Sequence, residues 1–278
     1  IASRLQHRNI AQVYDLQQRG DTYYLVMEFV SGTTLRDYLD LATRKGATFS
    51  HGFACYVIAE IADALHYAHT IRSPSDGALL GIVHRDVNPR NIMVSEAGDA
   101  KLLDFGIAYS LLAGRDRTQT GFVKGTFAYM SPEQLDMNGP TLDGRSDLFA
   151  LGIVLVELLT GRKPFDAGEQ SQLIAQIQKA SPVHVDAAVD GLPEGLQAIA
   201  RKALACERDG RYQSGAELGK ALRAFLQQQG TVYGASDAVL ELTRIAEAAD
   251  ATPHRTRVAR PTPPAPQVSF ESRAAPVP

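Results

Sequence analysis

The most constraining feature of this chain is a polar segment, HRDVNPRN at residues 84–91, which is followed by DFG at residues 104–106. Between them lie two short apolar segments separated by a Glu-Ala-Gly-Asp turn, a pattern that predicts a β-hairpin. A hairpin of this length returns the chain to its starting point. The sequence therefore predicts that Asp86, Asn91 and Asp104 meet in one cleft, where carboxylate and amide oxygens suit a hard divalent cation.

The composition narrows the class of protein. Of the 278 residues, 45% are hydrophobic and 21% are charged, as in globular chains of one large or two small domains. The net charge is −3, so no basic bias predicts binding to nucleic acid. The two cysteines, Cys55 and Cys206, form no CxxC motif, which predicts free thiols rather than a disulfide or a zinc site. The longest apolar run, residues 148–159, is too short to span a bilayer and predicts a buried core helix.

Local patterns predict the order of the elements. Residues 10–16 and 22–29 read as strands around a Gly-Asp turn. The polar, aperiodic stretch from Asp104 to Glu133 predicts a functional loop. Helices are expected from a cap at Thr33 or Thr34 to Lys45, from Ser50 to His69, at 145–160, 168–179, 193–205 and 214–228, and from Ser236 to Ala249.

Residues 251–278 differ in composition from the rest of the chain. They hold seven of its fourteen prolines, which predicts a disordered linker or tail, with a PxxP ligand as the alternative. The expected organisation is a remnant of an N-terminal lobe at 1–30, a C-terminal lobe at 31–230, an extra helix at 231–250 and the proline-rich tail at 251–278.

Several motifs in order resemble those of bacterial, eukaryotic-like serine/threonine protein kinases. HRDVNPRN and KLLDFGIA resemble the catalytic and magnesium-binding segments, and YYLVMEFVSGTTL resembles the fifth strand and the hinge. GTFAYMSPEQ resembles the peptide-binding loop, and RDGRYQSGAEL resembles the closing segment with its arginine. The resemblance covers about residues 1–228. It implies an α+β, protein-kinase-like fold with a mostly helical C-lobe and an incomplete β N-lobe.

The resemblance also implies roles for individual residues. Asp86 would accept or orient the proton of the acceptor hydroxyl, and Asn88 stands beside it in the catalytic loop. Asn91 and Asp104 would bind magnesium. The expected ATP-binding residues are Met27 as gatekeeper, the backbone groups of Glu28 and Val30 at the adenine, and Met93 beneath the base. For both methionines, simple core filling is the alternative.

Other residues would regulate or support the site. Arg85 would receive a phosphorylated hydroxyl of the activation loop, which offers Thr118 and Thr120; a solvated polar loop is the alternative. Thr126 would contact the catalytic aspartate and favour serine or threonine acceptors. The expected structural residues are Glu133 and Arg211, as a buried ion pair, and Asp147, as an acceptor for the catalytic-loop backbone.

The chain departs from the family pattern in two ways. Asn88 stands where these kinases usually have a lysine that neutralises phosphate charge. No glycine-rich loop, strand lysine or helix glutamate precedes the matching region. We therefore expect an N-lobe upstream of Ile1, and negligible phosphotransfer from the 278 residues alone.

Three functions are compatible with these motifs. The leading interpretation is an ATP-dependent protein kinase that transfers the γ-phosphoryl group to serine or threonine, with Mg²⁺ as cofactor and Mn²⁺ as a substitute. The alternatives are a pseudokinase or scaffold that binds partners, and a small-molecule phosphotransferase. The expected partner is a protein substrate, with no nucleic acid and no membrane segment in this chain. A dimer for trans-autophosphorylation and a cytoplasmic location of the kinase domain complete the prediction.

Overall fold

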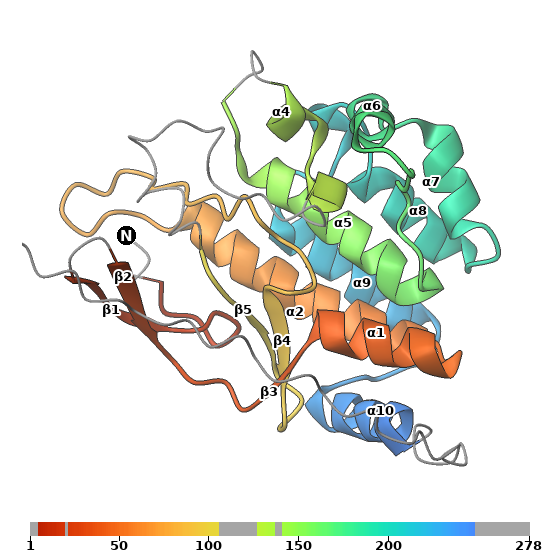
Figure 1. The fold of residues 1–278 in the computed structure, drawn as a ribbon, viewed down its shortest axis with the longest axis horizontal. Coiled ribbons are helices and arrows are strands. Elements are labelled where there is room, and N and C mark those ends of the chain that lie inside the picture. The colour runs from red at the N-terminus through yellow and green to blue at the C-terminus, as the bar shows by residue number, and fades with distance from the viewer. Residues whose placement is uncertain (1–4, 20–21, 106–126, 137–140, 248–278) are drawn as a thin grey trace, which may run out of the picture.

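The computed structural model describes residues 5–19, 22–105, 127–136 and 141–247. Two small sheets lie on one side of the molecule, and a larger group of helices lies on the other (Figure 1). The α+β arrangement predicted from the sequence is confirmed.

The first sheet is an antiparallel pair formed by β1 (Val13–Arg19) and β2 (Thr22–Met27), with Leu16 opposite Leu25. The strand expected at 10–16 begins later, because its first residues belong elsewhere. Ile10 forms a parallel bridge with Leu102, and the Ala11 N–H donates to the Leu102 carbonyl at 2.9 Å. The start of the chain is thereby tied to the second sheet.

The second sheet has the order β3–β4–β5. The predicted hairpin is present as β4 (Ile92–Ser95) and β5 (Ala100–Leu102), and β3 (Gly32–Thr34) adds an unpredicted edge strand to it. Both strands of the hairpin alternate buried and half-buried residues, so one face packs on the helices. The sheet carries the chain from the polar segment at 84–91 to Asp104.

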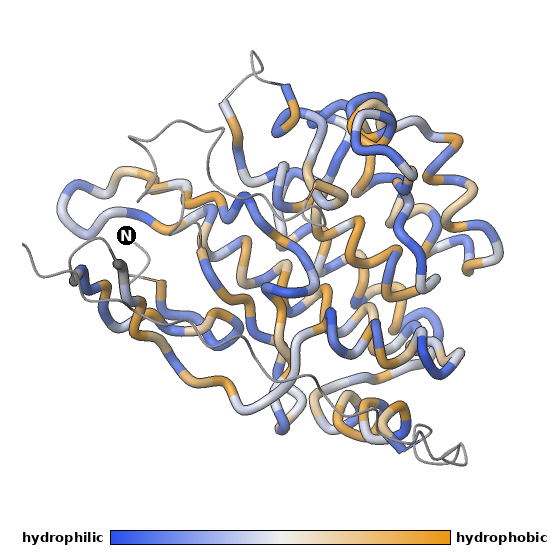
Figure 2. Tube along the Cα trace, viewed as in Figure 1, coloured by the Kyte–Doolittle hydropathy of each residue, from blue (hydrophilic) through white to orange (hydrophobic). Residues whose placement is uncertain are grey.

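Two helices form the centre of the helical part. The helix α2 (His51–Thr70) begins at the predicted cap Ser50, whose hydroxyl accepts from the Phe53 N–H at 3.1 Å. It packs against α5 (Gly144–Thr160), in which every residue from Ser146 to Leu159 is buried. The predicted buried core helix is therefore confirmed. Figure 2 shows hydrophobic residues recurring along these inner helices and a mixture of hydrophilic and hydrophobic residues on the outer ones.

The remaining helices surround this centre. The helix α1 (Leu35–Lys45) begins at Thr34, which caps it as predicted. The short helix α7 (Pro182–Val189) was not predicted, because only Pro182 at its first turn marks its start. The other helices are α4 (Pro132–Leu135), α6 (Gln170–Lys179), α8 (Glu194–Ala203) and α9 (Gly215–Gln228). Two short 3₁₀ turns, η2 (Phe127–Tyr129) and η3 (Arg208–Gly210), complete the helical part of the described chain.

A last helix, α10 (Ala235–Glu247), packs beneath α1 and the start of α2 (Figure 1). The carboxylate of Glu241 accepts hydrogen bonds from the Ser50 N–H, at 2.5 Å, and from the Ser50 hydroxyl. The Tyr233 hydroxyl also donates to it, at 2.8 Å. Gly98, in the β4–β5 turn, has φ +87°, and a Cβ atom there would lie 2.0 Å from the carbonyl oxygen of Ala235. The helix is therefore closely fitted to the turn of the hairpin.

In the part of the chain covered by the structure, no helix combines the length and the hydropathy needed to cross a membrane.

Candidate active site

Two side-chain amides fix the carboxylate of Asp86. The Nδ2 group of Asn88 donates to one carboxylate oxygen at 2.8 Å, and that of Asn91 donates to the other at 2.9 Å. Both amides also donate to the backbone carbonyl of Asp86, at 3.0 and 2.8 Å. Each carboxylate oxygen thus receives an N–H group, so the side chain is held in one orientation.

Asp147 holds the backbone that leads into this loop. Its carboxylate accepts from the backbone N–H groups of His84 and Arg85, both at 2.8 Å, and lies 2.8 Å from His69 Nε2. Arg85 has φ +70°, a conformation that costs free energy for a residue with a side chain and that is common at functional sites. The buried carboxylate, placed by the first turn of α5, therefore maintains a strained backbone immediately before Asp86.

The β4–β5 hairpin returns the chain to the same place. The Leu103 N–H donates to the Asn91 carbonyl at 2.8 Å, and the Leu103 carbonyl lies 2.7 Å from His84 Nε2. The rings of His84 and Phe105 pack in a tilted contact with centroids 4.7 Å apart. Between Leu103 and Phe105, Asp104 has φ +53°. Contacts on both sides thus fix Asp104 in a second strained conformation beside the loop.

The pKa of Asp86 reflects the groups around it. Burial by surrounding protein atoms raises the pKa of Asp86 above its ordinary value, and the charge of Asp104 raises it further. Hydrogen bonds from Asn91 and Asn88 and the charge of His84 lower the pKa, but by less. The outer surface of the Asp86 side chain is still exposed to solvent, so a substrate group can reach it.

The side-chain oxygen atoms of Asn91 and Asp104 suit a hard divalent cation. Because the Nδ2 group of Asn91 is directed to Asp86, its amide oxygen points the other way, and the Asp104 side chain is exposed. Among the described residues, no group of three or more His, Cys, Asp or Glu side chains could hold a metal. A cation here would take its other ligands from water or substrate oxygens, as Mg²⁺ commonly does.

The four predicted adenine-side residues lie on the two sheets and the segment between them. Met27 ends β2, Met93 lies in β4, and both are half-buried, whereas Val30 is buried. The Glu28 N–H donates to the Gln12 carbonyl at 2.7 Å, so only the carbonyl of Glu28 remains to meet an adenine. The carboxylate of Glu28 pairs with Lys101 at 2.8 Å.

The predicted ion pair between Glu133 and Arg211 is present and buried. The two guanidinium NH groups of Arg211 lie 2.8 and 2.9 Å from the two carboxylate oxygens of Glu133. The guanidinium also donates to the backbone carbonyls of Ala205, Cys206 and Arg145, and it packs 4.7 Å from the centre of the Phe149 ring. All five N–H donors of Arg211 are therefore satisfied.

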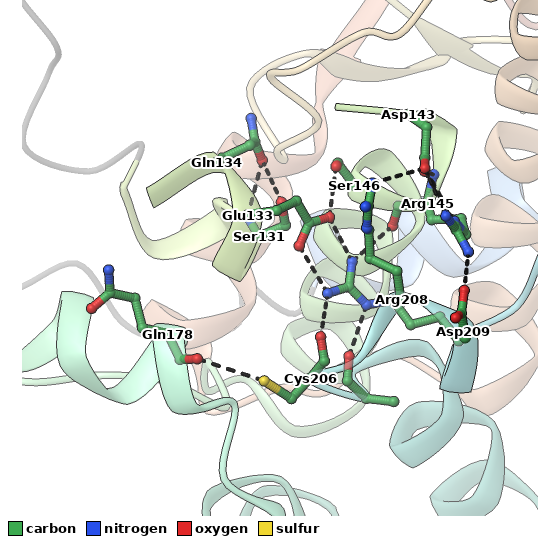
Figure 3. A network of polar contacts seen from close by, with 12 residues as sticks. Ser131, Glu133, Gln134, Asp143, Arg145, Ser146, Gln178, Cys206, Arg208 and Asp209 are labelled. Carbon is green, nitrogen blue, oxygen red and sulfur yellow. Dashed lines mark hydrogen bonds and ion pairs between the residues drawn. The ribbon is translucent and has the colours of Figure 1, made fainter. Parts of the chain in front are cut away.

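The contacts around Glu133 connect neighbouring segments, and Figure 3 shows this network. The Ser146 hydroxyl, from α5, donates to Glu133 at 2.6 Å, so the carboxylate links α4 to α5. Beside it, the Asp143 carboxylate binds both Arg145 and Arg208, at 2.8 and 2.9 Å. The short helix α4 is thus anchored to the base of the central helix and to the residue that follows η3.

The backbone of Arg85 is bonded to the short helix α4. Its carbonyl accepts from Gln134 Nε2, in α4, at 2.7 Å. The predicted partners Thr118 and Thr120, and the predicted substrate-loop residue Thr126, lie outside the described residues. The roles of Arg85 and of these threonines therefore stay predictions.

Sequence reasoning missed a polar network around Glu157. This buried residue of α5 lies 3.0 Å from Arg36 NH1 in α1 and accepts a 2.5 Å hydrogen bond from the Tyr129 hydroxyl in η2. Arg36 also pairs with Asp40, at 2.9 Å, and its backbone N–H donates to the Pro89 carbonyl at 3.0 Å. The available signal was a glutamate inside the apolar run LVELL, since a buried charge requires a partner.

A small sheet and a helical lobe that meet at such a loop and hairpin are the architecture of protein kinase domains. Residues 1–216 match the family model described as protein kinase domain, which is most of the chain. The chain therefore belongs to the protein kinase domain family, as its motifs predicted. Members of this family generally use ATP and a divalent metal ion.

Several of its relatives are bacterial kinases. The chain is 38% identical over 222 residues to the serine/threonine-protein kinase PknB of Mycobacterium tuberculosis, over 78% of this chain and 33% of that protein. It is 36% identical over 255 residues to a probable serine/threonine-protein kinase PknB of Bifidobacterium longum, over 87% of this chain and 34% of that protein. It is also 34% identical over 235 residues to the tyrosine-protein kinase MasK of Myxococcus xanthus, over 84% of this chain and 36% of that protein. The chain thus spans about a third of the length of these curated relatives.

Proposed function

We propose that the protein transfers the γ-phosphoryl group of ATP to serine or threonine hydroxyls of protein substrates, with Mg²⁺ as the cation and Mn²⁺ as a substitute. The observation that carries this proposal is the orientation of Asp86 by two amides beside Asp104. The family implies ATP and protein substrates in general. That the acceptor is serine or threonine, and that the cation is Mg²⁺ or Mn²⁺, belongs to this proposal.

Asp86 is the residue that receives the acceptor. The acceptor oxygen bonds to the γ-phosphorus as the bond from that phosphorus to the bridging oxygen of ADP breaks, and the hydroxyl proton passes to the Asp86 carboxylate. Its raised pKa makes it a better proton acceptor than an ordinary aspartate. Its fixed orientation places one oxygen where the hydroxyl must approach.

Asn91 and Asp104 would hold the cation, which neutralises charge on the transferred phosphoryl group. Asn91 has two functions in this arrangement, because its nitrogen orients Asp86 while its oxygen remains for the metal. Asp104 is held beside it by the contacts of Leu103 and Phe105. Positioning and charge neutralisation thus supply most of the catalysis.

The test is transfer of radiolabelled phosphate from ATP to peptides that differ only in carrying Ser, Thr or Tyr. It uses the natural full-length protein, since this chain spans about a third of its relatives. We expect transfer to Ser and Thr, and a loss of about a hundredfold or more for Asp86→Asn and Asp104→Asn. The matched control is Asp99→Asn, an exposed aspartate in the turn of the same hairpin, which should leave transfer unchanged. Tyr as the preferred acceptor would contradict the proposed specificity.

One observation favours a second candidate, a non-catalytic scaffold with the kinase fold. Asn88 stands where a lysine is usual, and an amide carries no positive charge. Its Nδ2 group donates to Asp86 instead. A scaffold predicts that the wild type and Asp86→Asn transfer equally little phosphate. Transfer that depends on Asp86 would exclude this alternative.

A further inference from the structure

The side chain of Arg90 is exposed at the catalytic loop. Its backbone N–H donates to the Asn88 side-chain oxygen at 2.9 Å, and the neighbouring Asn88 and Asn91 both bind Asp86. The residue is exposed, and its guanidinium forms no hydrogen bond or ion pair with any residue that the structure describes. A hydrogen-bonded loop therefore presents a positive charge, unpaired among the described residues, beside the residue that receives the acceptor.

Two acids connected to this part of the loop share one cation. Glu157 and Asp40 both pair with Arg36, whose backbone N–H is bonded to Pro89, the residue before Arg90. Glu157 also accepts from the Tyr129 hydroxyl. Arg36 alone offsets only one of these two negative charges.

Lys163 is a second cation near this network, which it contacts at Tyr129. The ammonium of Lys163 stands 5.3 Å from the centre of the Tyr129 ring, a cation–π contact, and makes no ion pair within the described ranges. Tyr129 belongs to η2, directly before α4. Together with Arg36, Arg90 and Lys163 supply three positive charges against the two carboxylates of Glu157 and Asp40.

From this arrangement we infer that the enzyme selects acceptor peptides in which acidic residues flank the phosphorylated hydroxyl. The inference rests on the proposed function. An acceptor that places its hydroxyl at Asp86 brings its neighbouring side chains over Arg90, where an aspartate or glutamate gains an ion pair and a lysine or arginine is repelled. Each such exposed contact is expected to change the specificity by about two- to fivefold.

The experiment compares three serine peptides that have glutamates, alanines or lysines on both sides of the acceptor. We measure kcat/KM for the full-length wild type and for Arg90→Ala and Arg90→Glu. The wild type should prefer the glutamate peptide to the lysine peptide, Arg90→Ala should lose most of this preference, and Arg90→Glu should reverse it. Raised salt should weaken the preference, because exposed charges are screened.

Arg44 provides the matched control, because it is exposed on the last turn of α1, about 12 Å along the helix from Arg36. Arg44→Ala should keep the wild-type preference. A preference that Arg90→Ala and Arg90→Glu leave unchanged, or no preference at all among transferred peptides, overturns the inference.

Binding of the same peptides, labelled with a fluorophore, separates this result from a failure of phosphotransfer. If no peptide is phosphorylated, the proposed function fails. Tighter binding of the glutamate peptide that reverses in Arg90→Glu would still support the acidic selectivity of the surface, and equal binding of all three peptides would contradict it.

Discussion

Arg211 and Glu133 form a bidentate ion pair, with N···O distances of 2.8 and 2.9 Å, in the interior of the helical lobe. The side chain of Arg211 is fully buried and that of Glu133 is 6% exposed. The two residues are 78 positions apart, so the pair fixes α4 to a segment that is distant in sequence. It stabilises the lobe only while both members are present.

Arg211→Met should lower the free energy of unfolding by about 3–5 kcal/mol, because it leaves the Glu133 carboxylate buried without its cation. Urea denaturation measures this change. The control is Arg201→Met, which breaks an exposed pair with Asp186 and should cost about 1 kcal/mol or less. Equal losses for the two variants would contradict the assignment of the buried pair.

The same pair predicts a dependence of stability on pH. Burial alone would raise the pKa of Glu133, but the hydrogen bonds from Arg211 and Ser146 outweigh it, so this pKa lies below its ordinary value of 4.5. The stabilising contribution is therefore complete above that value and is lost as the pH falls through the lowered pKa. Glu133→Gln should remove this part of the acid sensitivity, as seen in denaturation curves recorded at a series of pH values. An unchanged acid limb would show that other carboxylates control it.

Asn88→Ala should move the acid limb of the pH–rate profile to higher pH. Asn88 donates to the Asp86 carboxylate and so lowers its pKa; without this donor the pKa, already raised by burial, rises further. Asp86 must be ionised to accept a proton, so activity is lost earlier as the pH falls. The measurement is kcat/KM across the acidic range, with the alkaline limb as the internal control. A uniform loss at every pH, without a shift, would contradict this role.

Asp147→Asn should impair both stability and phosphotransfer. The carboxylate accepts from two consecutive backbone N–H groups, and an amide can supply only one oxygen to them. We expect a loss of about 1–3 kcal/mol in unfolding free energy and a lower kcat, because Arg85 is no longer held in its strained conformation. Thermal denaturation and peptide phosphorylation, measured on one preparation, check the two effects. Full activity in this variant would mean that the loop keeps its geometry without Asp147.

Glu241→Ala should loosen α10 from the start of α2. Glu241 accepts from Ser50 and Tyr233, and its loss leaves the Ser50 N–H without this partner, at an expected cost of about 1–3 kcal/mol. Glu247→Ala, an exposed site on the same helix, is the matched control and should change stability by much less. Hydrogen exchange of α10 provides a direct readout. Equal protection in the two variants would contradict the docking of α10 through Glu241.

Local sequence was sufficient for the features that depend on local chemistry. Thr34 and Ser50 cap their helices because their hydroxyls accept from the first turn, whatever the surroundings. The spacing from Asp86 to Asp104 required a hairpin, and α5 was predictable because an unbroken apolar run must be buried. The order of the motifs was enough to place the chain among the protein kinases.

Tertiary structure decided which polar groups are paired and which remain free. No local pattern distinguishes Arg36, committed to Glu157 from another helix, from Arg90, which has no partner in the described part of the chain. The strained backbones at Arg85 and Asp104 likewise depend on contacts with Asp147 and His84. Such pairings join residues far apart in sequence, and their strength depends on burial, which only the folded chain establishes.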